Sequence, residues 1–251
     1  MNLVVDLNAD LGEGSGFDRD LLKLVSSANI ACGFHAGDAG SIRETICAAR
    51  ECGVSVGAHP SLFDRENFGR KEFSVTPADV SEAVTYQLGV FQAISEALGV
   101  RPDHVKPHGA LYNMAARDEK LAQAVASAVA GFDLDLTLFA APGSRLAEQG
   151  LAHGLKVARE VFADRNYLSD GSLVPRSRPD ALLHDPVAAG ARALRMLREG
   201  KVMSIEGREV EVRAETICLH GDTPGAVEFA KVLRAQLENE GVAIQPPKPA
   251  R

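Results

Sequence analysis

Residues 105–113 read Val-Lys-Pro-His-Gly-Ala-Leu-Tyr-Asn, and this stretch decides the predicted fold. A short apolar lead-in changes here into a lysine, a proline that ends any β-ladder, a histidine, and a glycine that frees the backbone. Lys106 and His108 are two residues apart, so on an extended chain both side chains point to the same side. The segment therefore reads as the end of a strand that faces a pocket.

The same pattern ends five other segments, in which an apolar run breaks into His, Asp or Glu beside Gly or Pro. These segments are Asp6–Glu13, Ile30–Asp38, Val56–Pro60, Glu160–Arg165 and Ile217–Asp222. About seven short apolar strands alternate with amphipathic helices, which is typical of a parallel α/β sheet. Polar residues at the carboxyl ends of six strands favour closure into a barrel whose mouth is the active site. The alternative, an open doubly wound sheet, would gather its ligands at one switch point.

The predicted architecture is a single parallel (β/α) barrel-like catalytic domain over residues 1–244, with residues 245–251 as a flexible Pro-rich tail. Two long loops, 61–75 and 164–179, interrupt it, and alternating residues over 202–213 predict an appended β-hairpin. Strands are expected over 3–7, 29–32, 54–58, 105–108, 136–140, 155–162 and 216–219. Helices are expected over 18–26, 38–50, 77–98, 118–129, 144–152, 186–199 and 224–237.

Composition excludes several classes of protein. The net charge is −7 and no basic stripe is present, which argues against nucleic acid as a partner. No apolar run approaches the roughly 20 residues of a membrane span, and the first residues lack a leader pattern, so we expect a cytoplasmic protein. The four cysteines form no C-x-x-C pair, which argues against disulfide and structural-zinc frameworks.

Nucleotide-binding motifs are absent from the sequence. Gly12, Gly14 and Gly16 resemble a dinucleotide loop, but Phe17 fails the spacing of G-x-G-x-x-G. No G-x-x-x-x-G-K-[ST] stretch occurs either, so any ATP site is not a P-loop of this chain.

The strand ends supply the candidate site residues. Histidine recurs at equivalent strand ends, which distinguishes a functional set from ordinary core imidazoles: His35, His59, His108 and His220. We interpret the other three, His104, His153 and His184, as ordinary surface residues. The catalytic candidates are Asp10, His35, His59, Lys106, His108, Glu160, His220 and Asp222. The substrate-binding candidates are Asp6, Asn8, Asp38, Arg70, Asp164 and Arg165.

Two further chemistries use residue types that the sequence places at these strand ends. Cys32 lies beside the predicted site, but no base spacing identifies a partner that would make it a nucleophile. Histidines clustered with carboxylates are also typical of divalent metal sites. Because no H-x-x-x-H or H-E-x-x-H pair falls on a predicted helix, the sequence assigns no metal ligands, and a divalent metal stays an open alternative.

Seven motifs in order, from residue 6 to residue 222, resemble the LamB/YcsF family, which supplies the A subunit of the bacterial ATP-dependent 5-oxoprolinase. They are D-L-N-A-D-L-G-E, A-N-I-A-C-G-F-H-A-G-D, G-A-H-P-S, F-G-R, V-K-P-H-G-A-L-Y-N, E-x-F-A-D-R-x-Y and C-L-H-G-D. One departure is Leu62-Phe63, where the family pattern has an aromatic residue followed by proline.

The resemblance implies hydrolysis of 5-oxo-L-proline to L-glutamate, with ATP as co-substrate and subunits B and C as partners. It also implies a barrel-like fold related to the metal-dependent sugar deacetylases. Under this hypothesis a base among Asp10, His35 and His108 activates water, Lys106 and Arg165 hold carboxylate or phosphate oxygens, and His59, His220 and Asp222 orient groups or protonate the ring nitrogen. Two rival functions remain, which are a metal-dependent amide or sugar hydrolase acting alone and a non-catalytic lactam-binding subunit.

Overall fold

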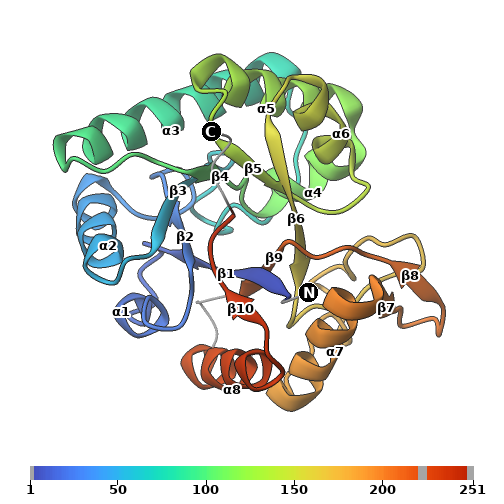
Figure 1. Cartoon of the computed structure of the whole chain (residues 1–251). Helices are drawn as coiled ribbons and strands as arrows, with labels where there is room; N and C mark the ends of the chain where they lie inside the picture. The colour runs from blue at the N-terminus through green and yellow to red at the C-terminus, as the bar shows by residue number, and fades with distance from the viewer. Residues whose placement is uncertain (1–2, 220–224, 248–251) are drawn as a thin grey trace.

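The computed structural model describes residues 3–219 and 225–247, and its centre is a closed barrel of parallel strands (Figure 1). Eight strands pair in the order β10-β1-β2-β3-β4-β5-β6-β9, and β1 also pairs with β9, so every strand except β10 belongs to the closed ring. The strands are β1 (Val4–Leu11), β2 (Ser27–Ala31), β3 (Ser55–His59), β4 (His104–Val105), β5 (Thr137–Ala140), β6 (Lys156–Phe162), β9 (Thr216–Leu219) and β10 (Ala243–Ile244). The predicted parallel barrel is therefore confirmed.

Strand β1 shows why the sheet closes around a polar centre. Leu7 and Ala9 are fully buried among the apolar residues of the core, whereas Asp6, Asn8 and Asp10 alternate with them and are also buried. Because successive side chains of a strand point to opposite faces, the apolar set packs on the helices and the polar set points into the barrel. The interior of the barrel is thus lined with polar groups that need partners.

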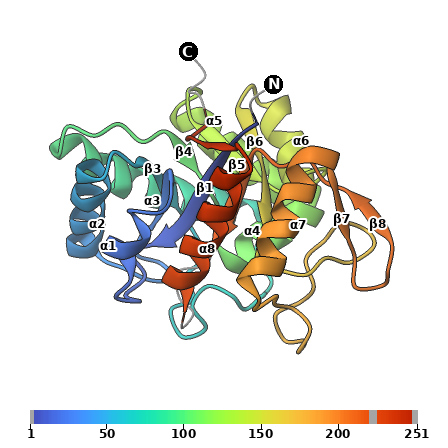
Figure 2. The same ribbon diagram turned by 60° about the horizontal axis from the view of Figure 1, so that its bottom comes forward.

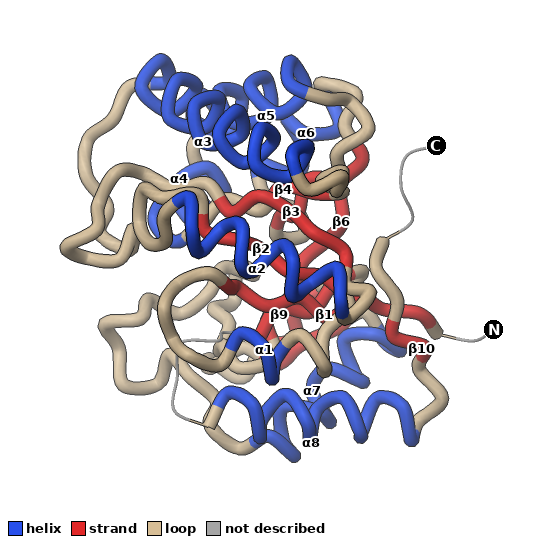
Figure 3. Tube along the Cα trace, turned by 90° about the vertical axis from the view of Figure 1, so that its left-hand side faces the viewer, coloured by secondary structure: helices blue, strands red, loops and turns tan. Residues whose placement is uncertain are grey.

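The helices surround the strands. They are α1 (Asp18–Leu21), α2 (Ala39–Glu51), α3 (Pro77–Ala97), α4 (Gly109–Arg117), α5 (Glu119–Phe132), α6 (Arg145–Ala152), α7 (Pro186–Glu199) and α8 (Ala226–Asn239). Figure 3 shows α3, α5 and α6 on one side of the strands and α7 and α8 on the other. No helix in the described ranges is both long enough and apolar enough to cross a membrane.

Helix starts follow the capping pattern of the sequence. Thr76 accepts a hydrogen bond from the backbone N–H of Asp79 and the Asp79 side chain accepts one from Thr76, which forms a capping box ahead of Pro77. Asp38 and Ser41 form the same box at the start of α2. Such caps satisfy backbone donors that a helix leaves unpaired, which is why these two starts could be predicted.

Two predictions of local structure were wrong. The helix expected over 18–26 ends at Leu21, and β2 already begins at Ser27, because the hydroxyl groups of Ser26 and Ser27 bond to the Asp6 carboxylate inside the barrel. The strand expected over 105–108 is only His104–Val105, and a helix that was not predicted, α4, follows His108 directly.

The appended hairpin is confirmed. Strands β7 (Lys201–Met203) and β8 (Glu209–Glu211) pair antiparallel outside the barrel and lie beside α7 (Figure 2). Strand β10 was not predicted. It adds a parallel pair to the first residues of β1, and the backbone N–H of Gln245 donates to the carbonyl of Val5.

Candidate active site

Asp6 lies inside the barrel and is enclosed by hydroxyl groups. Its Oδ1 accepts hydrogen bonds from Ser26 at 2.6 Å and Ser27 at 2.7 Å, and its Oδ2 accepts one from Thr216 at 2.5 Å. Burial raises the pKa of Asp6 to about 6, although these hydrogen bonds act in the opposite direction. Asp6 was a substrate-binding candidate, and the structure places it in a network that joins three strands.

A second interior network starts at Asn29 on β2. Its amide nitrogen donates to Asn8 Oδ1 at 2.6 Å and to Asp10 Oδ1 at 2.9 Å. Its Oδ1 accepts from His104 Nε2 at 2.8 Å, and the His104 ring stacks on Phe139. The interpretation of His104 as a surface residue was wrong, because the residue is only 1% exposed. Burial lowers the pKa of His104 to about 3, so its ring is neutral and supports the network.

Lys106 is the buried cation of the barrel. Its Nζ lies 2.8 Å from Asp10 Oδ1, 3.1 Å from Glu160 Oε1 and 2.9 Å from Cys218 Sγ. Burial alone would lower the pKa of Lys106, but the neighbouring anionic groups, with Asp10 the largest, raise the pKa well above its ordinary value. Lys106 therefore stays charged and neutralises two buried carboxylates. Its ammonium protons are directed at these groups rather than at the mouth.

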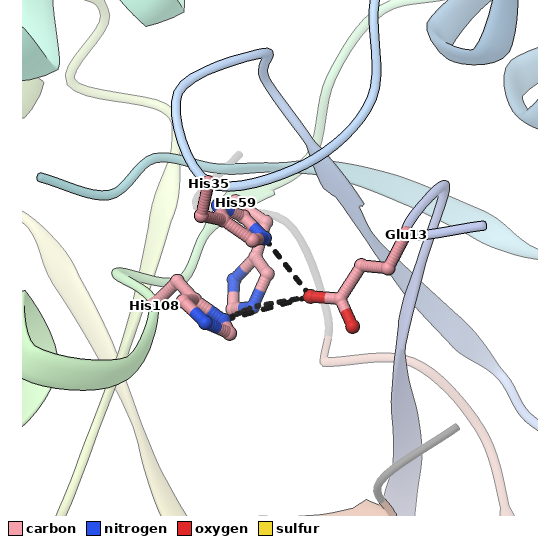
Figure 4. A group of neighbouring side chains, drawn as sticks. All are labelled: Glu13, His35, His59 and His108. Carbon is pink, nitrogen blue, oxygen red and sulfur yellow. Dashed lines mark hydrogen bonds and ion pairs between the residues drawn. The ribbon is translucent and has the colours of Figure 1, made fainter. Parts of the chain in front are cut away.

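The mouth of the barrel gathers three histidines and one glutamate (Figure 4). His35 follows β2, His59 ends β3, His108 precedes α4, and Glu13 follows the turn after β1. Glu13 Oε1 lies 2.9 Å from His35 Nε2, 3.5 Å from His108 Nδ1 and 3.9 Å from His59 Nε2. The side chains of Glu13 and the three histidines are at most 5% exposed. We call these four residues the mouth cluster.

Hydrogen bonds fix the tautomers of two of the rings. His59 Nδ1 lies 2.6 Å from the Lys106 carbonyl, and His108 Nε2 lies 2.9 Å from the Phe68 carbonyl. A carbonyl oxygen can only accept, so both of these ring nitrogens carry hydrogen and donate. The lone pairs of His59 and His108 are therefore on Nε2 and Nδ1, the atoms that face Glu13.

Burial keeps the imidazoles of His35 and His108 uncharged. Burial and the neighbouring His59 lower the pKa of His35 to about 2. Burial and the stacked His35 ring lower the pKa of His108 well below its ordinary value. Asp10 links the cluster to the interior, because its Oδ2 lies 3.3 Å from His59 Nε2 while its Oδ1 holds Lys106. The mouth thus presents the neutral rings of His35 and His108 beside carboxylates, which is suited to accepting a proton or binding a cation.

The long loop 61–75 covers this cluster. Gly69 packs so tightly that a Cβ there would lie 2.8 Å from Cβ of His35 and 2.9 Å from Cδ2 of His108. Arg65 donates to the carbonyls of Gly33 and Gly37, which ties the loop to the segment that carries His35. The guanidinium of Arg70 lies 4.8 Å above the Phe68 ring and places a positive charge at the rim of the site. The loop therefore shields the mouth from water.

Most of the predicted site residues meet in or below the mouth. The structure brings together Asp6, Asn8, Asp10, His35, His59, Arg70, Lys106, His108 and Glu160. Asp38 is elsewhere, because it is an exposed N-cap of α2. Asp164 and Arg165 begin the loop 164–179, where Arg165 is buried and donates to the Val174 carbonyl. His220 and Asp222 lie outside the described residues.

Two residues of the site were missed. Glu13 stands in the first motif, but it follows the Gly12 turn, where φ is +73°, and only this turn brings its carboxylate back to the histidines. A signal was present, since an acid beside glycine after a strand is the pattern that selected the other candidates. Asn29 pairs in register with Asp10, but nothing in the sequence aligns β2 with β1.

The fold and site together define a parallel α/β-barrel protein with a histidine-rich, carboxylate-bearing mouth. The chain belongs to the LamB/YcsF family, whose sequence profile matches residues 5–251. It is 48% identical over 250 residues to the A subunit of 5-oxoprolinase from Bordetella pertussis, covering 98% of this chain and 99% of that protein. The A subunit of 5-oxoprolinase from Bordetella parapertussis matches with the same identity and coverage.

Solved structures show the same relationship. The crystal structure of a lactam utilization protein from Thermus thermophilus superimposes with a TM-score of 0.90 at 46% identity, covering 97% of this chain and 99% of that one. A peptidoglycan deacetylase from Bacillus subtilis reaches a TM-score of 0.50 at 14% identity, covering 97% of this chain and 87% of that one. The second likeness concerns the fold alone.

Proposed function

We propose that this chain is the A subunit of an enzyme that hydrolyses 5-oxo-L-proline to L-glutamate, coupled to hydrolysis of ATP to ADP and phosphate. The observation that carries the proposal is the near-complete, 48% identical match to proteins named as the A subunit of 5-oxoprolinase. Those names support an assembly with further subunits, which we take to be B and C. ATP is then a co-substrate, bound with the help of the partners, because this chain contains no P-loop sequence.

The reaction explains why ATP is needed. The lactam C–N bond has partial double-bond character, which gives ordinary amides a rotational barrier of about 18–20 kcal/mol. Transfer of the γ-phosphoryl group to the amide oxygen, with ADP leaving, removes that resonance. Water then adds to the ring carbon, and the ring nitrogen leaves with a proton, which opens the ring as an acyl phosphate. A second water releases phosphate and glutamate, so the atoms balance.

The mouth cluster supplies what the water-addition step requires. The lone pairs of His59 and His108 and the Glu13 carboxylate face one small volume, where they can orient a water molecule and accept its proton. Asp10 Oδ2 lies 3.3 Å from His59 Nε2 and adds a second carboxylate beside this volume. Arg70, whose guanidinium lies 4.8 Å above the Phe68 ring, is a rim cation that could hold a substrate carboxylate or phosphate oxygen, whereas Lys106 lies deeper, against Asp10 and Glu160.

A second candidate function is a metal-dependent amide hydrolase that acts alone and needs no ATP. The observation that favours it is the mouth cluster itself, because three histidines and a carboxylate are a common ligand set for a catalytic metal. A third, a lactam-binding subunit without catalytic residues, would need only a cation or two for its ligand. It gives no role to three converging imidazoles.

The test is glutamate release from 5-oxoproline and ATP by purified subunits B and C, with and without this chain. We expect glutamate only when all three are present, and we expect His108→Ala to reduce turnover by at least about 10²-fold. The exposed His184, replaced by Ala, is the matched control and should leave turnover unchanged. Full activity without this chain would refute the proposal. Hydrolysis of simple acetamides by this chain alone, without ATP, would favour the second candidate.

A further inference from the structure

The arrangement of His59 and His108 leaves an electrostatic problem inside the mouth cluster. His59 Nε2 and His108 Nδ1 lie 2.9 Å apart, which is hydrogen-bond distance. Both atoms carry lone pairs, because the opposite nitrogen of each ring donates to a backbone carbonyl. Two acceptors facing each other repel, so a positive charge must lie between them. Glu13 Oε1, 3.5 Å and 3.9 Å from the same two nitrogens, adds a further acceptor.

We infer that Glu13, His35, His59 and His108 bind one divalent transition-metal ion, with Zn²⁺ as the best-fitting type. This inference rests on the geometry of the cluster. With the ion bound, the lone pairs of His59 and His108 would hold the metal and would no longer be proton acceptors for water, whereas the overall reaction stays as proposed. One ligand atom from each residue lies within 4.8 Å of all the others. An ion at the centre attracts the lone pairs of His59 and His108, which otherwise repel each other, and it would replace the hydrogen bond between His35 Nε2 and Glu13 Oε1, which lie 2.9 Å apart.

The distances fit a four-coordinate ion. Metal–nitrogen and metal–oxygen bonds of about 2.0–2.2 Å in a tetrahedral zinc site place neighbouring ligand atoms roughly 3.3–3.5 Å apart. The separations of Glu13 Oε1 from the three ring nitrogens, 2.9, 3.5 and 3.9 Å, bracket that value. The 2.9 Å between His59 Nε2 and His108 Nδ1 is shorter than that value and the widest separation in the cluster, within 4.8 Å, is longer, so the side chains must shift to form the site.

The surroundings of the ligands resemble those of an organised metal centre. Metal-binding histidines usually donate their second N–H to a carbonyl or carboxylate, which fixes the ring and its tautomer. The carbonyls of Lys106 and Phe68 do this for His59 and His108. His35 has no such partner, because its buried Nδ1 makes no hydrogen bond within the described part of the chain. We therefore expect His35 to be the least constrained ligand.

The ligand types select the class of metal. Imidazole nitrogens suit Zn²⁺, Co²⁺ and Ni²⁺, whereas Mg²⁺ and Ca²⁺ prefer shells made of oxygen. The charge of the site also suits a divalent cation, because Glu13 contributes one carboxylate to the site and the Asp10 carboxylate lies beside His59. The ion would supply a Lewis acid at the position where the mouth meets substrate.

The decisive experiment measures metal in the full-length chain. The purified protein is stripped with a chelator, reloaded with Zn²⁺ or Co²⁺, desalted, and analysed by elemental mass spectrometry. We expect about one metal per chain and, with Co²⁺, the strong visible absorption of a four-coordinate site. Mg²⁺ at the same concentration should not be retained. No retained Zn²⁺ or Co²⁺ in the parent protein would overturn the inference and leave a proton shared between His59 and His108 as the positive charge.

Variants then assign the ligands. Glu13→Gln keeps the shape of the side chain and removes its charge, and His59→Ala removes a ring nitrogen. Each should weaken Zn²⁺ binding by at least the about 10–100-fold seen when groups supporting a metal ligand are removed. His184→Ala, at an exposed position, is the control and should bind as the parent does. Circular dichroism establishes that each variant is folded. Metal binding unchanged in both Glu13→Gln and His59→Ala would place the ion elsewhere.

Discussion

His59 Nε2 lies 2.9 Å from His108 Nδ1, although the remaining nitrogen of each ring is committed to a backbone carbonyl. This relationship makes the mouth cluster different from a set of satisfied core histidines. Core imidazoles pair donor with acceptor, as His104 and Asn29 do. His59 and His108 instead turn their acceptor atoms toward each other and toward Glu13. Such an arrangement is unfavourable without a cation or a proton-exchanging ligand, so it indicates a site built for chemistry.

Glu13 is the residue on which this chemistry is most easily tested. Replacing it by Gln removes the carboxylate that faces all three rings while keeping the volume of the side chain. In the reconstituted assay we expect turnover to fall by about 10²–10⁴-fold, the range for loss of a general acid–base group. Glu72→Gln, at an exposed residue paired with Arg117, is the control. Turnover of Glu13→Gln within a few-fold of the parent would remove Glu13 from the active site.

Lys106 should matter first for stability. Its ammonium group neutralises Asp10 and Glu160 in a site that is almost fully buried. Lys106→Met leaves those carboxylates without their cation, and breaking a buried pair in this way typically destabilises a protein by about 3–5 kcal/mol. Urea unfolding followed by circular dichroism measures the change. Lys23→Met, at an exposed lysine paired with Asp20, should leave the unfolding midpoint almost unchanged. Equal effects of the two substitutions would contradict this role.

The parts of the fold that the sequence predicted are those set by local chemistry. The alternation of Asp6, Asn8 and Asp10 with apolar residues marked a strand with one polar face, and the Thr76-Pro77 pair marked a helix start. Helix α4 escaped prediction because its first residues, Gly109 onward, continue a motif that reads as the end of a strand. Strand β4, with two residues, is too short to show any periodicity.

The sequence predicted many of the residues of the site but few of the contacts between them. Lys106 faces the interior as expected, but its partners Glu160 and Cys218 come from β6 and β9, far along the chain. Strands β6 and β9 come close to Lys106 only because the barrel closes, and no local sequence pattern predicts that proximity. Glu13 depends in the same way on a turn at Gly12. Long-range register and chain reversals therefore account for most of what sequence analysis missed.

A substitution at Gly69 tests whether activity depends on the packing of the loop 61–75 against the histidines. A Cβ at this position would press on His35 and His108, and φ is +65°, so Gly69→Ala combines steric overlap with backbone strain. Overpacking of this kind typically destabilises by about 1–3 kcal/mol. Gly53 is the matched control, because its φ is +69° but nothing lies within 4 Å of an added Cβ. We expect Gly69→Ala to lose more stability than Gly53→Ala and to lose glutamate release as well. Equal losses would show that the loop does not pack on the histidines.

Asp6 provides a prediction for the pH dependence of stability. Burial raises its pKa from 3.8 to about 6, so the folded state holds the proton more tightly than the unfolded state does. The stability that this group contributes is therefore present at low pH and lost as pH rises through about 6. The difference of about 2 pKa units corresponds to roughly 3 kcal/mol. Asp6→Asn carries no titrating proton, so its free energy of unfolding should lack this component.

The measurement is urea unfolding of the parent and of Asp6→Asn between pH 4 and pH 7. Asp6→Asn disturbs the hydrogen bonds to Ser26, Ser27 and Thr216 at every pH, which shifts its curve by a constant amount. The informative quantity is the change in the gap between the two curves. We expect the parent to lose stability relative to the variant as pH rises, with most of the change below pH 6. Curves that stay parallel would mean that Asp6 is ionised throughout, held in that state by its three hydroxyl donors.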